Sequence, residues 1–267
     1  MTNKINVSFS GGQSSAYMLY ILLQNYDKKD LVITFANTGK EHEKTLEFVR
    51  DIENNWGLNI VWLEMDIKEK FIKGVNKSRD CIIYKIVDFE TASRNGEPFN
   101  KLIENFGLPN RAARFCSQYL KVQPIEKYLR FLNIDYKTAM GIRIDESKRA
   151  RKFNKLDYIF PLIDYHVTKK DVDNFWNKQP FKLNIPNHLG NCDLCFLKAI
   201  SKRRRILKDF PRIGDWWQEK EKQANSTFHN NLSVEQIAKQ ANSKNLKIYQ
   251  KKEQLSLGFD ITCFCGD

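Results

Sequence analysis

A pair of glycines near the start of the chain has the residue types of an anion-binding loop. The stretch SFSGGQSSAYM, residues 8–18, follows the apolar residues Ile5 and Val7 and leads into an apolar run. A strand, a glycine turn and a helix in this order point backbone amides toward the helix N-terminus, where phosphate and sulfate bind. The alternative is a plain turn with a serine N-cap. We predict an anion site built from Ser10, Gly11, Gly12, Ser14 and Ser15.

The cysteines supply a second kind of chemistry. Cys192 and Cys195 form a C-x-x-C, Cys263 and Cys265 form a C-x-C, and Cys116 stands alone. The first residues have no signal-peptide pattern, so we expect a cytoplasmic protein, in which disulfides are disfavoured. The paired spacings then indicate a metal, an iron–sulfur cluster or a redox dithiol. A further cysteine, at position 81 in an apolar stretch, is expected to be a buried thiol.

Alternating strand and helix patterns in the first half predict the scaffold for these groups. Helices are expected over residues 14–23 and 41–53, and strands over residues 4–9, 31–35, 59–64 and 136–140. Such alternation is typical of an α/β fold with a Rossmann-like parallel sheet covered on both faces. The stretch after the third strand, residues 71–111, is less regular.

The second half of the sequence turns helical. Helices are expected over residues 169–176, 196–208, 215–224 and 233–240. We therefore predict a nucleotide-binding α/β domain over residues 1–168 and a smaller helical C-terminal domain over 169–267, which carries both cysteine pairs. This C-terminal part is expected to close over the site.

Composition limits the partners. The chain is 42% hydrophobic and 12% aromatic, which excludes the disordered class, and no apolar run is long enough to span a membrane. Its net charge of +12 favours a nucleotide or a nucleic acid, unless the lysines only solvate the surface. A basic stretch over residues 198–208, with Trp216 and Trp217 beyond it, could follow a phosphate backbone. For the tryptophans we favour a place in the core.

Several stretches, taken together and in order, resemble the phosphoadenosine phosphosulfate reductase family. This family belongs to the adenine nucleotide alpha-hydrolase group, with the N-type ATP pyrophosphatases. The resemblance starts at the glycine loop and runs to about Trp176. Its further stretches are FANTGKEHEKTLEFV from Phe35, RFCSQYLKVQPIEKYL from Arg114, GIRIDESKRAR from Gly141 and FPLIDYHVTKKDVDNFW from Phe160. The loop has Ser14 where the group commonly has aspartate.

The resemblance implies roles for particular residues. Asn37, Thr38 and Gly39 would lie near the adenosine of a bound nucleotide. The basic residues Lys121, Arg143 and Arg149 would neutralise its anionic end, and Arg side chains suit phosphate and sulfate.

The resemblance also implies a 4Fe–4S cluster. Its ligands would be Cys116, Cys192, Cys195 and one tail cysteine, Cys265 or Cys263. Structural zinc and a redox dithiol are the alternatives, and magnesium is a further candidate ion.

Three functions are compatible with these features. In the first, a thiolate of Cys263 or Cys265 attacks the sulfur of phosphoadenosine phosphosulfate, and a thioredoxin-like reductant then releases sulfite. In the second, ATP activates a nucleic acid for sulfur insertion, as in phosphorothioation or tRNA thiolation. In the third, the chain binds a nucleotide without turnover. The absence of the loop aspartate and the terminal Cys-Gly favour the first.

Overall fold

A computed structural model describes residues 4–68, 81–186, 188–190, 192–229 and 232–243. Within these residues one sheet has the order β4-β3-β2-β1-β5-β6, and all neighbours are parallel except β3 and β4. The strands are β1 Lys4–Ser8, β2 Leu31–Asn37, β3 Ile60–Ile67, β4 Ile82–Val87, β5 Tyr136–Met140 and β6 Tyr158–Ile159. The predicted α/β class and Rossmann-like sheet are confirmed.

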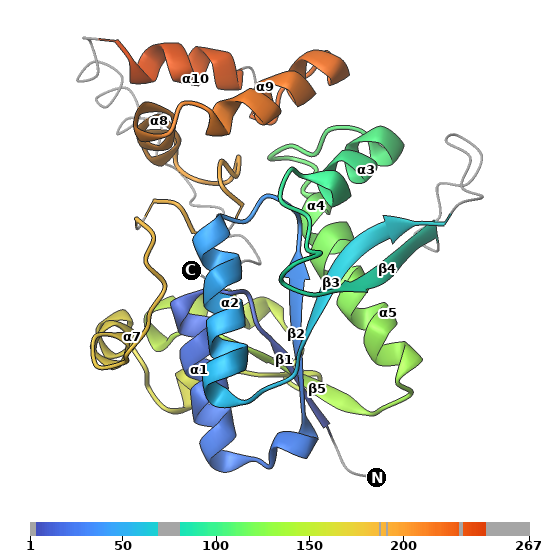
Figure 1. Cartoon of the computed structure of the whole chain (residues 1–267), viewed down its shortest axis with the longest axis vertical. Coiled ribbons are helices and arrows are strands. Elements are labelled where there is room, and N and C mark those ends of the chain that lie inside the picture. Colours follow the sequence, from blue (N-terminus) through green and yellow to red (C-terminus); the bar gives the residue numbers. More distant parts are fainter. Residues whose placement is uncertain (1–3, 69–80, 187, 191, 230–231, 244–267) are drawn as a thin grey trace.

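Helices lie on both faces of this sheet and beyond one of its ends (Figure 1). The helices of the first part are α1 Gln13–Asn25, α2 Glu43–Trp56, α3 Glu97–Phe106, α4 Phe115–Ser117 and α5 Gln123–Phe131. The later ones are α6 Pro161–Asp164, α7 Lys169–Trp176, α8 Ile200–Asp209, α9 Ile213–Ala224 and α10 Val234–Ala241. Short helical turns η1 Lys28–Asp30, η3 Gln118–Val122 and η4 Ile144–Lys152 complete the described elements. None of the described helices is both long and apolar enough to cross a bilayer.

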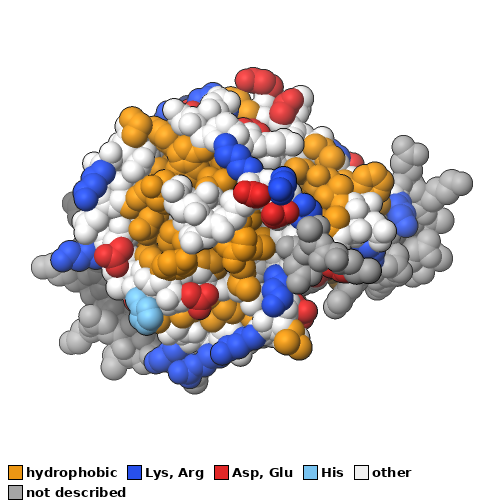
Figure 2. Space-filling model, turned by 90° about the horizontal axis from the view of Figure 1, so that it is seen from below, with side chains coloured by type: hydrophobic (Ala, Val, Ile, Leu, Met, Phe, Trp, Pro, Cys, Tyr) orange, Lys and Arg blue, Asp and Glu red, His pale blue; other side chains and the backbone are white. Residues whose placement is uncertain are grey.

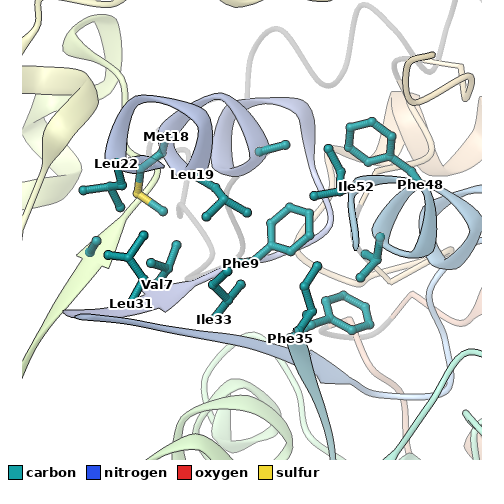
Figure 3. Close-up of a cluster of buried hydrophobic side chains, with 14 of the residues drawn as sticks. Val7, Phe9, Met18, Leu19, Leu22, Leu31, Ile33, Phe35, Phe48 and Ile52 are labelled. Carbon is teal, nitrogen blue, oxygen red and sulfur yellow. The ribbon is translucent and has the colours of Figure 1, made fainter. Parts of the chain in front are cut away.

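The largest buried cluster fixes α1 and α2 against one face of the sheet. Alternate residues of the strands, such as Val7 and Ile33, point toward Leu19 of α1, and Phe9 fills the space beside them (Figure 3). Trp176 of α7 joins the same cluster and donates a hydrogen bond from Nε1 to the Gln13 carbonyl at 3.0 Å. A helix predicted to open the C-terminal part therefore packs directly beside the glycine loop.

A second cluster lies past the carboxyl ends of the strands. It joins Met65 and Phe99 of the first part to Leu207 and Trp217 of the helical part. This cluster also contains Cys81, which is buried as predicted, and Trp217, which confirms the predicted place of that tryptophan in the core. The two halves of the chain therefore share an apolar core next to the sheet edge where ligands bind in open parallel sheets.

The sequence pattern over residues 71–111 was too irregular to predict a strand or a helix, but this stretch of the structure contains both. It holds β4, which forms an antiparallel edge with β3, and α3, which begins after Gly96. Strand β4 pairs on one side only within the sheet and keeps Lys85 and Ile86 exposed, so its period-two pattern is weak. Seen from below, the molecule shows hydrophobic side chains near the middle of that face, with many of the Lys and Arg side chains around its margin (Figure 2).

Candidate nucleotide and sulfur site

The glycine loop leaves the first amides of α1 open to a ligand. Gly12 is the N-cap of α1 and has no side chain with which to cap it. Gly11 has φ +75°, and a Cβ there would lie 2.7 Å from the Thr45 methyl group. Ser15 Oγ accepts a hydrogen bond from the Ser10 amide at 3.2 Å and donates one to the Gly12 carbonyl at 2.9 Å. The loop is thus held in one shape, with its amides at a helix N-terminus.

The sheet register brings Arg143 to this loop. Ser8 at the end of β1 pairs with Met140 at the end of β5, so the chain segments that follow them leave the sheet side by side. Arg143 is only 6% exposed and donates from Nη1 to Ser14 Oγ at 2.9 Å. This contact puts a fixed positive charge beside the predicted anion site.

Two carboxylates hold the arginines of this segment. Arg143 pairs with Asp145 at 3.2 Å and with Glu146 at 3.3 Å, and Glu146 also pairs with Arg149 at 2.7 Å. The Glu146 carboxylate therefore bridges Arg143 and Arg149, and the two arginines and two acids form one network. Arg143 therefore contacts the loop directly, and Arg149 is linked to it through Glu146.

Two hollows open on either side of Ser10. One, of about 320 Å³, lies between the sheet and α5, and Lys121, Thr138 and Tyr158 are among its walls. The other, of about 490 Å³, is lined by the glycine loop and by lysines of the later chain: Lys169, Lys182 and Lys202. Ser10 is the residue that lines both hollows. A ligand with one uncharged and one anionic end fits this arrangement.

The Asn37-Thr38-Gly39 loop is fixed by a buried acid that the sequence reading missed. Asn37 ends β2 and pairs in register with Glu64 of β3. Asn37 Nδ2 donates to Glu64 Oε1 at 2.7 Å, and the Ser93 amide and hydroxyl donate to the same carboxylate at 2.6 and 2.8 Å. Lys85 pairs with it at 2.8 Å. Glu64 lies inside strand β3, and its burial depends on partners from β2, β4 and the segment after β4, which the local sequence does not reveal.

Replacement of Glu64 tests this support. We expect Glu64→Gln to lower the free energy of unfolding by about 2 kcal/mol, because an NH₂ group would face donors that are buried with it. Urea unfolding followed by circular dichroism measures the change. The matched control is Glu90→Gln, since Glu90 is exposed. Equal stability of the two variants would contradict a supporting role for Glu64.

The same loop contacts the first cysteine of the C-x-x-C. Thr38 Oγ1 lies 3.5 Å from Cys192 Sγ, and Glu41 forms an isolated antiparallel bridge with Cys192. Next to it, the Asp193 amide donates to the Lys40 carbonyl at 2.7 Å, and the side chains of Lys40 and Asp193 pair at 3.0 Å. Cys192, which lies far along the chain, therefore contacts the loop predicted to lie near the adenosine.

Burial keeps Cys192 protonated in this setting. Loss of hydration raises the pKa of the Cys192 thiol to about 11, although the nearby Lys121 ammonium opposes the shift. The Lys121 ammonium lies 3.6 Å from the Glu41 carboxylate, so Lys121 is paired with an acid of the same loop. A metal ion bound here would have to displace the thiol proton.

Three of the predicted cysteine ligands lie in or beside one buried cluster. Cys116 in α4 and Cys195 pack against the buried cluster that contains Cys192. Among the residues the structure describes, however, no three His, Cys, Asp or Glu side chains gather as a metal site. Cys263 and Cys265 lie outside the described residues. The four-cysteine set thus stays a prediction.

Only some of the basic residues over 198–208 are exposed. Helix α8 begins at Ile200, and Lys198 before it donates to the carbonyls of Leu189 at 3.3 Å and Asp193 at 2.9 Å. Arg203 and Arg204 are buried, at 0% and 3% exposure, because they lie on the side of α8 that packs inward. Only part of the basic stretch is therefore available to a partner.

Similarity to known proteins covers most of the chain. A family model described as the phosphoadenosine phosphosulfate reductase domain matches residues 4–221. An uncharacterized nin region protein of Escherichia phage lambda is 34% identical over 206 residues, which cover 76% of this chain and 69% of the phage protein.

Two uncharacterized proteins of Methanocaldococcus jannaschii are more distant. They are 25% and 28% identical over 226 and 234 residues, and each match covers 80% of this chain. The matches span only 40% and 46% of these longer proteins. The family match extends from the first strand through the glycine loop, the arginine segment and the C-x-x-C, so the chain belongs to the phosphoadenosine phosphosulfate reductase family.

Proposed function

We propose that the chain binds an adenine nucleotide across the two hollows and performs reductase-type sulfur chemistry on it. The observation that carries the proposal is the position of Ser10, which lines both the cavity under α5 and the hollow at the glycine loop. The nucleoside would occupy the first, and the phosphate or sulfonate end would lie on the amides of the second. Membership of the family supports an adenine nucleotide as the ligand.

Fixed positive charge is what the reaction requires of this site. A thiolate that attacks a sulfonucleotide is an anion approaching an anion, so the surrounding charges must lower the repulsion. Arg143 at Ser14 and the lysines around the loop hollow would serve this purpose. The attack forms a sulfur–sulfur bond and breaks the bond from sulfur to phosphate oxygen, and the adenosine bisphosphate leaves with those electrons.

A cysteine of the tail, Cys263 or Cys265, is the proposed nucleophile, and its product is an enzyme S-sulfonate. A thioredoxin-like dithiol would supply the two electrons that release sulfite and restore the thiol. Cys192 is less suited to this attack, since it is buried and burial raises the pKa of its thiol to about 11.

A metal centre at the C-x-x-C is part of the proposal. Cys192 and Cys195 would be two of its thiolate ligands, Cys116 a third and a tail cysteine the fourth. Thiol ligands suit a 4Fe–4S cluster or zinc, and the shared apolar surroundings suit either. When bound, the centre would tie the tail cysteine to the C-x-x-C and so hold the tail close to the nucleotide site. Magnesium remains a further candidate ion.

The second candidate is ATP-dependent sulfur insertion into a nucleic acid. The net charge of +12 and the three lysines at the loop hollow favour it. The third, a nucleotide-binding protein without turnover, predicts affinity but no product.

Product analysis separates the three candidates. Anaerobic protein with phosphoadenosine phosphosulfate and reduced thioredoxin is expected to release sulfite, with one adenosine bisphosphate for each sulfite. Pyrophosphate release from ATP that depends on added RNA or DNA would instead support the second candidate. Binding without either product would support the third, and both results would contradict the reductase proposal.

A further inference from the structure

The hydroxyl of Thr45 is a buried polar group without a hydrogen-bond partner among the described residues. Thr45 is 4% exposed, and its Oγ1 atom forms no hydrogen bond there. Buried hydroxyls of native proteins are nearly always bonded, because a buried polar atom without a partner has lost its water and gained nothing in return. This hydroxyl therefore points to a partner that the described residues do not supply.

Thr45 is part of the wall of the loop hollow. It belongs to the first turn of α2, which begins at Glu43. Its methyl group packs against the glycine loop, since a Cβ at Gly11 would lie 2.7 Å from Thr45 Cγ2. The start of α2 and the glycine loop are therefore in contact and bound the same hollow.

Two helices begin at this hollow. Helices α1 and α2 follow the carboxyl ends of the neighbouring parallel strands β1 and β2, and their side chains, such as Leu19 and Phe48, pack on one face of the sheet (Figure 3). Both N-termini thus lie at one sheet edge, where the positive ends of the helix dipoles favour an anion. The Lys44 and Thr45 amides are already bonded to His42, so α2 would contact a ligand through the Thr45 side chain.

The charged side chains of the hollow also favour an anion. Lys169 is paired at 2.5 Å with Asp173, which is the one acid among the described residues of this wall. Lys182 donates to the uncharged Asn177 side chain at 3.2 Å, and Lys202 is exposed on α8. Three lysines therefore face one carboxylate, and the net positive charge suits an oxyanion.

We infer that the Thr45 hydroxyl donates a hydrogen bond to the oxyanion, phosphate or sulfonate, that binds at the glycine loop. The inference rests on the proposed function, which puts the anionic end of the nucleotide in this hollow, and it adds a ligand-contacting residue from a second helix. Threonine in a helix uses two χ1 values, so the hydroxyl can turn toward the hollow without movement of the backbone. A bond to a charged acceptor is roughly twice as strong as one to a neutral acceptor.

Titration calorimetry with three ligands tests the inference. Wild type, Thr45→Val and Thr45→Ser are titrated with adenosine, adenosine 5′-phosphate and adenosine 5′-phosphosulfate. Thr45→Val should bind the anionic ligands about tenfold more weakly and adenosine as tightly as wild type does. Thr45→Ser should stay close to wild type because it keeps the hydroxyl. A loss with both anions would put the hydroxyl on the phosphate, and a loss with the phosphosulfate alone would put it on the sulfonate. Equal affinity of wild type and Thr45→Val for both anions, or an equal loss for adenosine, would overturn the inference.

Urea unfolding separates a binding role from a packing role. Valine has nearly the shape and the helix propensity of threonine and removes the unpaired hydroxyl, so the midpoint of Thr45→Val should be at least as high as that of wild type. The matched control is Thr34→Val. Thr34 is 0% exposed, but its hydroxyl donates to Asn6 Oδ1 at 2.9 Å, so this variant should unfold at lower urea and keep the anion affinity.

Two further results would count against the account in different places. A lower midpoint for Thr45→Val would show that the hydroxyl has a partner inside the protein, and it would overturn the inference while the proposed function stands. If wild type bound none of the three ligands, the proposed function would be wrong, and the inference with it.

Discussion

Replacement of Arg143 by methionine should weaken binding of an adenine nucleotide on the order of a hundredfold. Removal of one partner from a buried charge pair costs about 2–5 kcal/mol, and 1.4 kcal/mol is a tenfold change in affinity. Two effects add here. The ligand loses the cation fixed at Ser14, and Asp145 and Glu146 keep their negative charges beside the loop with one arginine fewer.

The matched control for this variant is Arg151→Met. Arg151 lies on the same turn, η4, is exposed, and its replacement changes the net charge equally. Titration calorimetry with phosphoadenosine phosphosulfate should show at most a small loss for Arg151→Met. Arg143→Lys should recover part of the affinity, since a lysine restores charge without the fork of donors. Similar affinities for Arg143→Met and Arg151→Met would show that only net charge matters.

The second large effect is expected at Gly141, where strand β5 meets the start of α1. A Cβ at this position would lie 2.8 Å from Ser15 Cα and 3.1 Å from Ser15 N, and both are backbone atoms. Because backbone cannot move aside as a side chain can, Gly141→Ala must push α1 away from the strand. We expect a loss of unfolding free energy of about 2–3 kcal/mol, in the range for overpacked sites, and a loss of nucleotide binding.

Gly190→Ala provides the control for that substitution. A Cβ at Gly190 would meet nothing within 4 Å, although this residue lines the same loop hollow. Urea unfolding and nucleotide titration should therefore leave Gly190→Ala close to wild type. If Gly141→Ala were as stable as Gly190→Ala and bound nucleotide equally well, the loop would not depend on close contact between Ser15 and the segment after β5.

Elements with a clear period were predictable from the sequence. Strand β5 and helix α7 have the predicted bounds, Tyr136–Met140 and Lys169–Trp176, because a following glycine marks the end of the strand and a threonine N-cap marks the start of the helix. Helix α8 begins four residues later than predicted, at Ile200. The C-x-x-C turn before it uses its backbone amides locally, as from Cys195 to the Cys192 carbonyl at 3.2 Å.

The candidate site was predictable where a motif is local and obscure where contacts are distant. The glycine loop and Arg143 belong to recognisable stretches, so their residues could be named in advance. The surroundings of Glu64, Lys182 and Arg203 are set by neighbours far along the chain. A buried acid, a hollow-lining lysine and a buried arginine look like surface residues in a sequence, because burial of a charge is decided by tertiary packing.

The most direct test of the account is a calorimetric titration of anaerobically purified protein with phosphoadenosine phosphosulfate and with ATP, each with magnesium. The account predicts saturable binding of one nucleotide per chain, with the sulfonucleotide bound more tightly than ATP. Tighter binding of ATP would contradict the reductase assignment and favour the nucleic-acid reaction. If neither nucleotide bound, the glycine loop would be a turn without a ligand, and the central claim would be wrong.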